Sequence, residues 1–335
     1  SRQIFAECQV PHPDGSPLVY TVDDLAQETL ALKQRNPHLK RCVVKLNEGF
    51  SGEGNALLDL RDLGDRPALA EIHQRFQTMR FQSSDETWLT FQPMISELGA
   101  IVEAFIEGEV KRSPSVQGRI NPCGTVEVLS THDQILGGPD GQIFLGCEFP
   151  AHQDYRLQLQ HYGQAVGEKL ANYGALERFG VDFVVVQQDS GRWDVQAIEI
   201  NLRKGGTTHP FMAMKLLTKG EYNTEDGRFY SLQGQAKYYK ATDNLESDRY
   251  RGLLPSDLMD AIAFNQLHFD TSTETGTVFH LMGCLSEFGK LGMTIIGNSR
   301  GEAEALYNQV SAALDRETSD EAMARLTMPF SWPSS

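Results

Sequence analysis

Two acidic residues near the middle of the chain are spaced to face each other across a β-hairpin. The segments 181–186 and 193–201 are apolar and rich in β-branched residues, which predicts two antiparallel strands. With the turn centred at 190–191, Asp182 stands opposite Glu199, with their Cβ atoms roughly 5 Å apart. Such a pair of carboxylates is repulsive unless a proton or a cation lies between them.

Asn201 adds an amide oxygen to this pair. It lies two residues beyond Glu199, so the pleat of the strand places both on one face. Two carboxylates and an amide oxygen form an all-oxygen site, which suits Mg²⁺ or Mn²⁺ better than Zn²⁺. The alternative is a solvated face with ordinary surface acids. The strongly apolar setting of Asp182 and Glu199 favours the metal site.

A glycine-rich segment forms a second candidate site. Three glycines fall within residues 49–54, directly after a short apolar strand, 42–46, that carries Lys45. Glycines let backbone amides approach an anion closely, and the lysine supplies a positive charge for phosphates. The spacing matches neither a Walker A loop nor a dinucleotide-binding loop. A flexible turn is the alternative, but Lys45 and the oxygen site together favour nucleotide chemistry.

The composition indicates an ordinary globular protein and excludes some partners. The 335 residues are 40% hydrophobic and 22% charged, a length and composition typical of about two domains. The net charge of −15, with no basic run, argues against nucleic acid and anionic membranes as partners. We find no apolar run of membrane-spanning length and no signal peptide.

The five cysteines are far apart, and none forms a C-x-x-C motif. We therefore expect reduced thiols in the cytoplasm, with no disulfide framework and no zinc site. The chain opens without methionine, so we expect a processed or trimmed piece of a longer protein.

The elements that must position these residues are both helical and extended. A helix is expected after the cap at Thr21, another over 155–173, and a last one after Ser299, whose cap pairs with Glu302. We expect a long polar loop at 220–235. Short strands are predicted at 42–46, 87–91, 100–106, 116–121, 125–130, 142–145, 276–282 and 292–297. The pattern is mixed α and β, without the regular alternation of a doubly wound sheet.

Taken in order, these parts resemble the ATP-grasp superfamily. Residues 44–54 resemble its lysine strand and phosphate-covering loop, and Ile101–Glu109 resembles its interlobe hinge. Asp182 with Glu199–Asn201 resembles its metal-ligand set. The resemblance implies an α+β fold of two lobes that clasp ATP, followed by a small α/β C-terminal domain.

A closer resemblance is to the pheganomycin-type peptide ligases, a branch of carboxylate–amine ligases. It is carried by residues 45–55, by 199–210, and by 276–282 with 289–297. We therefore predict an N-terminal lobe at 1–106, a C-terminal lobe at 107–220, and a linker with a small domain at 221–335.

This chain departs from the family pattern at its start. The additional N-terminal domain that is usual in the superfamily is not seen before the first lobe. The residue at the place of a second phosphate-binding lysine is Arg2.

The resemblance implies ATP-dependent amide-bond formation through an acyl phosphate, with release of ADP and phosphate. The substrates would be a small carboxylate and an amine, either amino acids or short peptides, and ATP would bind with Mg²⁺ or Mn²⁺. The sequence names neither substrate and leaves the oligomeric state open, a homo-oligomer included. Two alternatives remain: a non-catalytic nucleotide-binding protein, and an enzyme that only phosphorylates a carboxylate.

The resemblance also assigns roles to residues. Lys45 and Arg203 would be catalytic, with Arg203 stabilising charge on the transferred phosphoryl group. Asp182, Glu199 and Asn201 would bind the metal. His209 is expected to cap a helix, and His280 to pack in a core. Glu103, Phe105 and Ile106 would frame adenine, and Glu109 or Glu107 would hold the ribose. ATP would be bound by Lys45, Gly49, Ser51, Gly52, Glu53, Gly54, Glu103, Phe105, Ile106 and Glu109.

Overall fold

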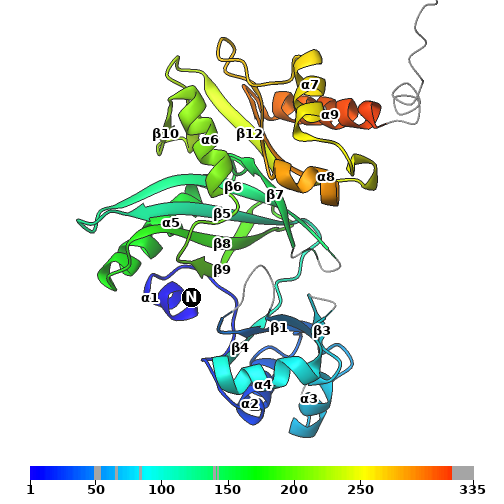
Figure 1. Ribbon diagram of the computed structural model, residues 1–335. Coiled ribbons are helices and arrows are strands. Elements are labelled where there is room, and N and C mark those ends of the chain that lie inside the picture. Colours follow the sequence, from blue (N-terminus) through cyan, green and yellow to red (C-terminus); the bar gives the residue numbers. More distant parts are fainter. Residues whose placement is uncertain (49–53, 65–66, 83–84, 139–140, 142, 319–335) are drawn as a thin grey trace, which may run out of the picture. The chain divides into compact units, whose positions relative to one another are not determined.

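The computed structural model describes residues 1–335 apart from 49–53, 65–66, 83–84, 139–140, 142 and 319–335 (Figure 1). The described chain forms two compact units. Unit 1 comprises Ser1–Ser113, Leu136–Phe144 and Asp182–Ile200, and unit 2 comprises Pro114–Ile135, Leu145–Val181 and Asn201–Ser335. The three segments expected from the sequence, 1–106, 107–220 and 221–335, remain a prediction.

Unit 1 is built on an antiparallel sheet of four strands in the order β3-β2-β1-β4. These strands are β1 (Arg41–Leu46), β2 (Asn55–Asp59), β3 (Arg80–Phe81) and β4 (Ala100–Ala104). Three helices cover one face of the sheet: α2 (Val22–Arg35), α3 (Leu69–Phe76) and α4 (Trp88–Leu98) (Figure 1). The short helix α1 (Arg2–Glu7) precedes them.

Strand β1 shows how the sequence orients the site. Cys42, Val44 and Leu46 are buried in the core beneath the helices, whereas the alternate residues are half-buried. Because side chains alternate across a strand, Val43 and Lys45 lie on the face turned away from these helices. The alternation of side chains along the strand therefore directs Lys45 out of the core.

Unit 1 also contains residues 182–200 of the predicted hairpin, with the predicted metal ligands Asp182 and Glu199. Strand β8 (Glu177–Gln187) pairs with β9 (Trp193–Asn201), as the sequence predicted. Within unit 1, the amide of Gln187 donates to the carbonyl of Val110 at 3.0 Å. This bond ties the end of β8 to the chain that follows β4.

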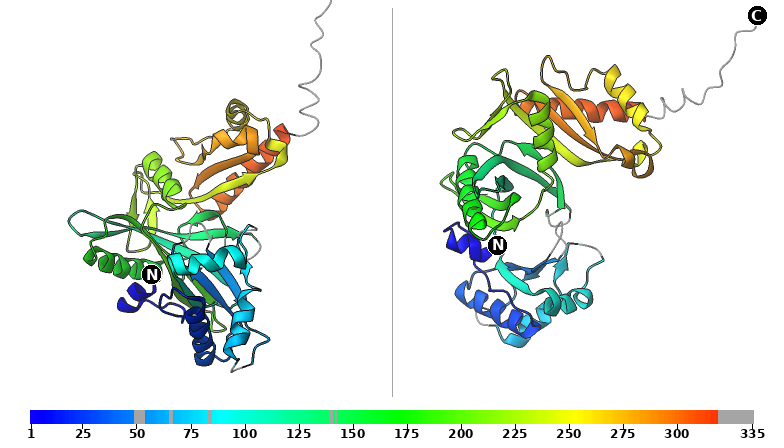
Figure 2. Two further views of the ribbon diagram at one scale, coloured as in Figure 1. Left: turned by 60° about the horizontal axis from the view of Figure 1, so that its bottom comes forward. Right: turned by 60° about the vertical axis from the view of Figure 1, so that its left-hand side comes forward.

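Unit 2 contains the strand order β10-β11-β12-β7-β6-β5, which continues into the first half of β8. Strand β14 pairs with both β12 and β13. Helix α9 packs against β12 and β14, and α7 packs on α9 (Figure 2). The elements are β5 (Lys111–Ile120), β6 (Val126–Gly137), β7 (Ile143–Phe149), α5 (Arg156–Asn172), α6 (Thr208–Thr218), β10 (Glu221–Asn223), β11 (Arg228–Tyr230), β12 (Ala236–Glu246), α7 (Pro255–Phe264), β13 (Gly276–His280), α8 (Leu285–Phe288), β14 (Lys290–Gly297) and α9 (Arg300–Glu317).

Two of the expected elements are wrong. Residues 87–91 begin a helix instead of forming a strand, because the Thr87 hydroxyl accepts from the amide of Thr90 and caps α4. The segment 220–235 contains the paired strands β10 and β11 instead of an unbroken loop. The caps of α2 by Thr21 and of α9 by Ser299 are confirmed.

The five cysteines are free thiols in the structure. Within the described ranges, no helix combines the length and the apolar character needed to cross a bilayer.

Candidate functional site

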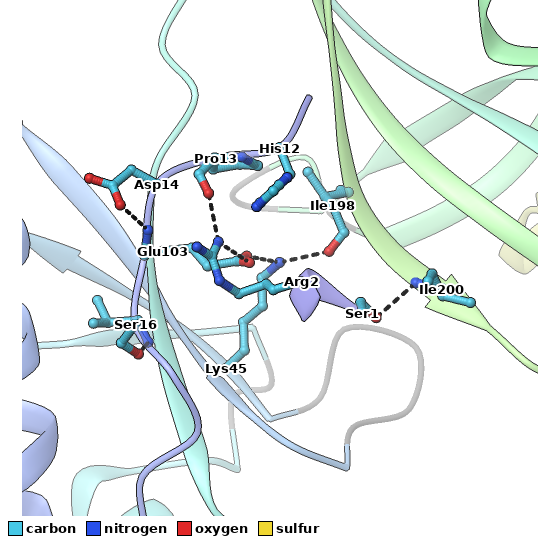
Figure 3. Close-up of polar contacts among 12 residues, drawn as sticks. Ser1, Arg2, His12, Pro13, Asp14, Ser16, Lys45, Glu103, Ile198 and Ile200 are labelled. Carbon is cyan, nitrogen blue, oxygen red and sulfur yellow. Dashed lines mark hydrogen bonds and ion pairs between the residues drawn. The ribbon is translucent and has the colours of Figure 1, made fainter. Parts of the chain in front are cut away.

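A lysine and a glutamate form an ion pair on the face of the unit 1 sheet that is turned away from its helices. Lys45 Nζ lies 2.5 Å from Glu103 Oε2 (Figure 3). Strands β1 and β4 are antiparallel, and Val43 is paired with Glu103, so Lys45 is the diagonal neighbour of Glu103 on one face. The pair therefore follows directly from strand register.

Glu103 is buried, with 3% of its surface exposed, and its charge is compensated twice. Arg2 Nη1 lies 3.0 Å from Glu103 Oε1 and donates to the carbonyl of Pro13 at 2.6 Å. Burial alone would raise the pKa of Glu103, but the charges and hydrogen bonds of Lys45 and Arg2 outweigh it and hold this pKa below its usual value. Glu103 therefore stays ionised.

The segment before α2 closes over this pair. Gly15 forms a bridge with Glu103, and a Cβ at Gly15 would lie 2.4 Å from the carbonyl oxygen of Val102 and 2.9 Å from Arg2 Nη1. Only glycine permits so close an approach of the two backbones. Arg2, expected at the place of a second phosphate-binding lysine, is thus bound to Glu103.

Strand β9 borders the same cluster in unit 1. Lys45 Nζ donates to the carbonyl of Ile198 at 3.4 Å, and the amide of Ile200 donates to Ser1 Oγ at 3.0 Å (Figure 3). The pKa of the Ser1 amine is lowered chiefly by burial, while the negative charges of Glu103 and Glu199 act in the opposite sense. Glu199 therefore belongs to the electrostatic surroundings of Lys45 and Glu103.

The hairpin turn is one residue longer than predicted. The amide of Gly191 donates to the carbonyl of Gln188, and the amide of Gln188 donates to the carbonyl of Arg192, both at 2.8 Å. Gly191 has a φ of 79°, so the loop is a turn followed by a left-handed glycine. The predicted centre at 190–191 is wrong, because Gln188 pairs with Arg192.

This turn matters for the metal ligands. An uninterrupted ladder from the Gln188–Arg192 pair sets Asp182 opposite Ile198, on the other face from Glu199. One extra residue on β9, a β-bulge, restores the predicted pairing of Asp182 with Glu199. The metal set therefore stays a prediction. Its donors are suitable, because Glu199 is exposed, Asp182 and Asn201 are half-buried, and all three offer oxygen.

The hinge after β4 is held by charged side chains. Arg41 binds Glu107 with two bonds, Nε to Oε1 at 2.9 Å and Nη2 to Oε2 at 2.5 Å. The Arg41 guanidinium and the Lys111 ammonium lie 4.2 Å and 4.4 Å from the centre of the Phe105 ring. The Phe105 ring is thus engaged by two cations.

The remaining hinge residues include a close backbone approach. A Cβ at Gly108 would lie 2.4 Å from Val186 Cγ1, so the hinge backbone contacts the end of β8 directly. Ile106 is half-buried and Glu109 is exposed. Their expected contacts with adenine and ribose remain predictions.

The glycine-rich segment connects β1 to β2, which are adjacent antiparallel strands. Gly49, Ser51, Gly52 and Glu53 lie outside the described residues. Gly54 is described: its φ is 81°, its carbonyl accepts from Leu46 at 2.8 Å, and its amide donates to Glu86 Oε1 at 3.1 Å. The position after a lysine strand, as predicted, is confirmed.

Unit 2 carries the loop that precedes α6. Thr208 Oγ1 accepts from the amide of Gly205 at 3.1 Å and donates to Gln117 Oε1 at 3.0 Å, and Gln117 Nε2 donates to Thr207 Oγ1. Gln117 of β5 thus anchors the small-residue loop. Arg203, just before it, is exposed and donates to the carbonyl of Lys204 at 3.3 Å.

Sequence reasoning missed the mutual binding of Lys45 and Glu103. It assigned Lys45 to phosphate and Glu103 to adenine separately. No local signal in the sequence could have found it, because the pairing requires β1 and β4 to be neighbours in the register that makes the two residues diagonal neighbours.

Comparison with known proteins identifies the fold of the chain. Residues 66–225 match a family model described as IQCH-like, ATP-grasp, and residues 257–310 match one described as the PGM1 C-terminal domain. Biotin carboxylase from Campylobacter jejuni, solved as a β,γ-ATP complex, covers 96% of this chain with a TM-score of 0.59 at 12% identity, over 70% of its own length. The chain has the ATP-grasp fold. The predicted fold is thereby confirmed, and the second family match confirms the additional C-terminal domain.

Further ATP-grasp neighbours agree. N5-carboxyaminoimidazole synthetase from Staphylococcus aureus, in complex with ADP, covers 92% of this chain and 69% of its own, with a TM-score of 0.54 and 12% identity. The biotin carboxylase domain of the Hydrogenobacter thermophilus 2-oxoglutarate carboxylase covers 88% and 60%, with a TM-score of 0.55 and 15% identity. At these identities the likeness concerns the fold alone.

Two curated relatives match in sequence. L-propargylglycine–L-glutamate ligase of Streptantibioticus cattleyicolor is 32% identical over 280 residues, which is 82% of this chain and 54% of that protein. IQ motif-containing protein H of Danio rerio is 24% identical over 252 residues, or 66% of this chain and 24% of that protein. The first relative shows that the chain belongs to the ATP-grasp superfamily, as predicted. The chain spans about half of the first relative and a quarter of the second.

Proposed function

We propose that the chain is an ATP-dependent carboxylate–amine ligase that forms an amide bond through an acyl phosphate. The observation that carries the proposal is its 32% identity to a ligase named for joining two amino acids. We infer that its substrates are likewise small carboxylates and amines, amino acids or short peptides. ATP and these metabolites are cytoplasmic, which is where we place the reaction.

The chemistry requires activation of a poor acyl donor. A carboxylate oxygen attacks the γ-phosphorus of ATP, ADP leaves, and an acyl phosphate forms. The amine then attacks the acyl carbon, the C–O bond to phosphate breaks, and phosphate departs. Both reactants of the first step are anions, so positive charge must be supplied around them.

Lys45 is the positive group that we assign to the phosphates. An ammonium has three N–H donors. Glu103 takes one at 2.5 Å and the carbonyl of Ile198 accepts another at 3.4 Å, which leaves the third for a phosphate oxygen. Glu103 and Ile198 would thus orient Lys45 before ATP arrives. We assign Arg203 to the transferred phosphoryl group and the segment 49–54 to the phosphates, as expected from the sequence.

A divalent cation fits the remaining acids. Asp182, Glu199 and Asn201 offer only oxygen donors, which suit Mg²⁺ or Mn²⁺. When bound, the metal would neutralise phosphate charge. Asp182 and Glu199 would otherwise repel ATP, and Glu199 belongs to the electrostatic surroundings of Lys45 and Glu103, which supports a metal-dependent site.

A second candidate function is nucleotide binding without ligation, or phosphorylation of a carboxylate alone. The observation that favours it is the match to IQ motif-containing protein H, whose name describes no enzyme.

An assay of ADP release distinguishes these functions. The chain is incubated with ATP, Mg²⁺ and a panel of amino acids and short peptides, and the products are identified by mass spectrometry. The panel includes L-propargylglycine and L-glutamate. The ligase requires acid and amine together and yields a condensed product. Amine-independent ADP formation without a condensed product would contradict it.

A further inference from the structure

Two histidines and an aspartate converge in unit 2. His209 lies in the first turn of α6, Asp243 on β12 and His280 at the end of β13. His209 Nε2 lies 3.1 Å from His280 Nε2, and Asp243 Oδ1 lies 2.7 Å from the His280 nitrogen and 3.5 Å from that of His209. The expected roles of His209 as a cap and of His280 as a packed core residue miss this cluster.

The three separations match those around a metal ion. Ligand atoms about 2.1 Å from a tetrahedral ion stand roughly 3.4 Å from one another. The observed distances of 2.7, 3.1 and 3.5 Å need only small side-chain adjustments to reach this geometry. Two imidazoles and a carboxylate, with the fourth position left to water, are a recurring zinc-binding set.

The proton inventory of the cluster also favours a cation. The two Nε2 atoms face each other, so both cannot carry a hydrogen along the line that joins them. At least one imidazole lone pair and one carboxylate lone pair therefore point at the same position. A positive ion at that position would accept electron pairs from the two imidazoles and the carboxylate together.

The backbone is shaped around the His280 ring. In the sheet, β14 lies between β12 and β13, and Gly292 of β14 is the register partner of His280. A Cβ at Gly292 would lie 2.3 Å from His280 Nε2, so the ring lies across β14 where no side chain obstructs it. Gly292 thus lets His280 reach Asp243 two strands away.

A β-bulge in β12 directs the side chain of Asp243. The register of β12 on β14 shifts between Thr242 and Leu245, which marks a β-bulge at 243–244. The Thr242 hydroxyl accepts from the amide of Asn244 at 3.0 Å and holds the bulge. Bulges commonly redirect side chains at functional sites. Helix α6, which carries His209, packs against β12 and β14.

We propose that His209, Asp243 and His280 bind one divalent transition-metal ion, with Zn²⁺ the best match to the donors. The site joins α6 to β12 and β13 and leaves a coordination position for water. The sequence excluded zinc because its cysteines form no motif, but this site uses no cysteine. The proposal does not rest on the ligase function.

The test is metal binding to the full chain, stripped with chelator and freed of any affinity tag, in excess Mg²⁺. Co²⁺ is titrated while its visible absorption is recorded, and Zn²⁺ is then used to displace it. We expect one Co²⁺ per chain with the spectrum of a four-coordinate site. His280→Ala and Asp243→Ala should weaken binding at least about tenfold, since even second-shell changes cost that much.

Gly292→Ala keeps all three ligands and tests the geometry. Its methyl group occupies the place of the ring, so it should weaken Co²⁺ binding, whereas Gly283→Ala, with open space around its Cβ, should not. His161→Ala, on the exposed surface of α5, is the control for adventitious histidine binding. His209→Gln replaces an exposed ligand, so it should weaken Co²⁺ binding without misfolding the chain. Failure of the wild type to bind Co²⁺ or Zn²⁺, or binding unchanged in His209→Gln and Asp243→Ala, overturns the proposal.

Discussion

Lys45 and Glu103 are bound to each other across β1 and β4, with Nζ 2.5 Å from Oε2. Glu103 is buried and also binds Arg2, while Lys45 keeps 21% of its side chain exposed. A fixed, ionised glutamate thus orients a partly accessible lysine. This relationship connects the stability of unit 1 with the proposed binding of phosphate.

Replacing Lys45 should impair both ATP binding and turnover. Lys45→Met removes the positive charge that we assign to the phosphates, so kcat/KM should fall at least about 100-fold, the scale of one lost electrostatic donor. Calorimetry with ATP and Mg²⁺ should show a correspondingly weaker Kd. The exposed Lys40→Met is the matched control and should leave both unchanged. Equal ATP affinities in the two variants would remove Lys45 from the site.

Replacing Glu103 should destabilise the fold in a pH-dependent way. Glu103→Gln leaves Lys45 and Arg2 without their anion and should cost about 2 kcal/mol at neutral pH, less than a fully buried pair because Lys45 is partly exposed. The pKa of Glu103 is depressed in the fold, so its stabilisation is present above the unfolded pKa and is lost as pH falls through the folded pKa. Denaturant unfolding at several pH values should show the two proteins converging in acid.

The control for that comparison is Glu97→Gln, on an exposed site of α4. Its unfolding free energy should follow the wild type at every pH. A Glu103→Gln protein that stays below the wild type by a constant amount into strong acid would disprove the ionic account.

Replacing Glu199 tests the metal assignment. Glu199→Gln keeps the shape of the side chain and removes its charge, so the Mg²⁺ concentration needed for half-maximal turnover should rise about tenfold or more. Asp189→Asn, in the turn of the same hairpin, is the control and should behave as wild type. Turnover and Mg²⁺ dependence unchanged in Glu199→Gln would contradict the assignment.

The contact of Gly108 with Val186 predicts a coupled pair. Gly108→Ala places a methyl group 2.4 Å from Val186 Cγ1 and should lower the unfolding free energy by about 1–3 kcal/mol. Val186→Ala removes the obstructing atoms. The double variant should therefore lose less unfolding free energy than the two single variants lose in total. A double-mutant cycle measures this coupling. Strict additivity would show that the two residues do not contact each other.

Much of the fold was predictable from local signals. The short apolar run at 42–46 identified β1, and the caps at Thr21 and Ser299 placed α2 and α9. The strand predicted at 87–91 was wrong, because a short apolar run is compatible with a strand or a helix. Recognising Thr87 as a helix cap would have decided between them.

The candidate site was less predictable, because it depends on register and on residues distant in sequence. Residue types suggested Lys45 and Glu103 but not their pairing. One extra residue in the turn at Gly191 alters which side chains face Glu199. The cluster of His209, Asp243 and His280 depends on a bulge and on Gly292, which no local pattern reveals.

The transfer of carboxylate oxygen to phosphate tests the ligase mechanism most directly. The chain is incubated with ATP, Mg²⁺, an amine and an amino acid whose carboxylate carries ¹⁸O, and the products are examined by mass spectrometry. The acyl-phosphate route predicts amide, ADP and inorganic phosphate that contains one ¹⁸O atom from the carboxylate. Amide formed with unlabelled phosphate, or with label in AMP, would contradict the mechanism.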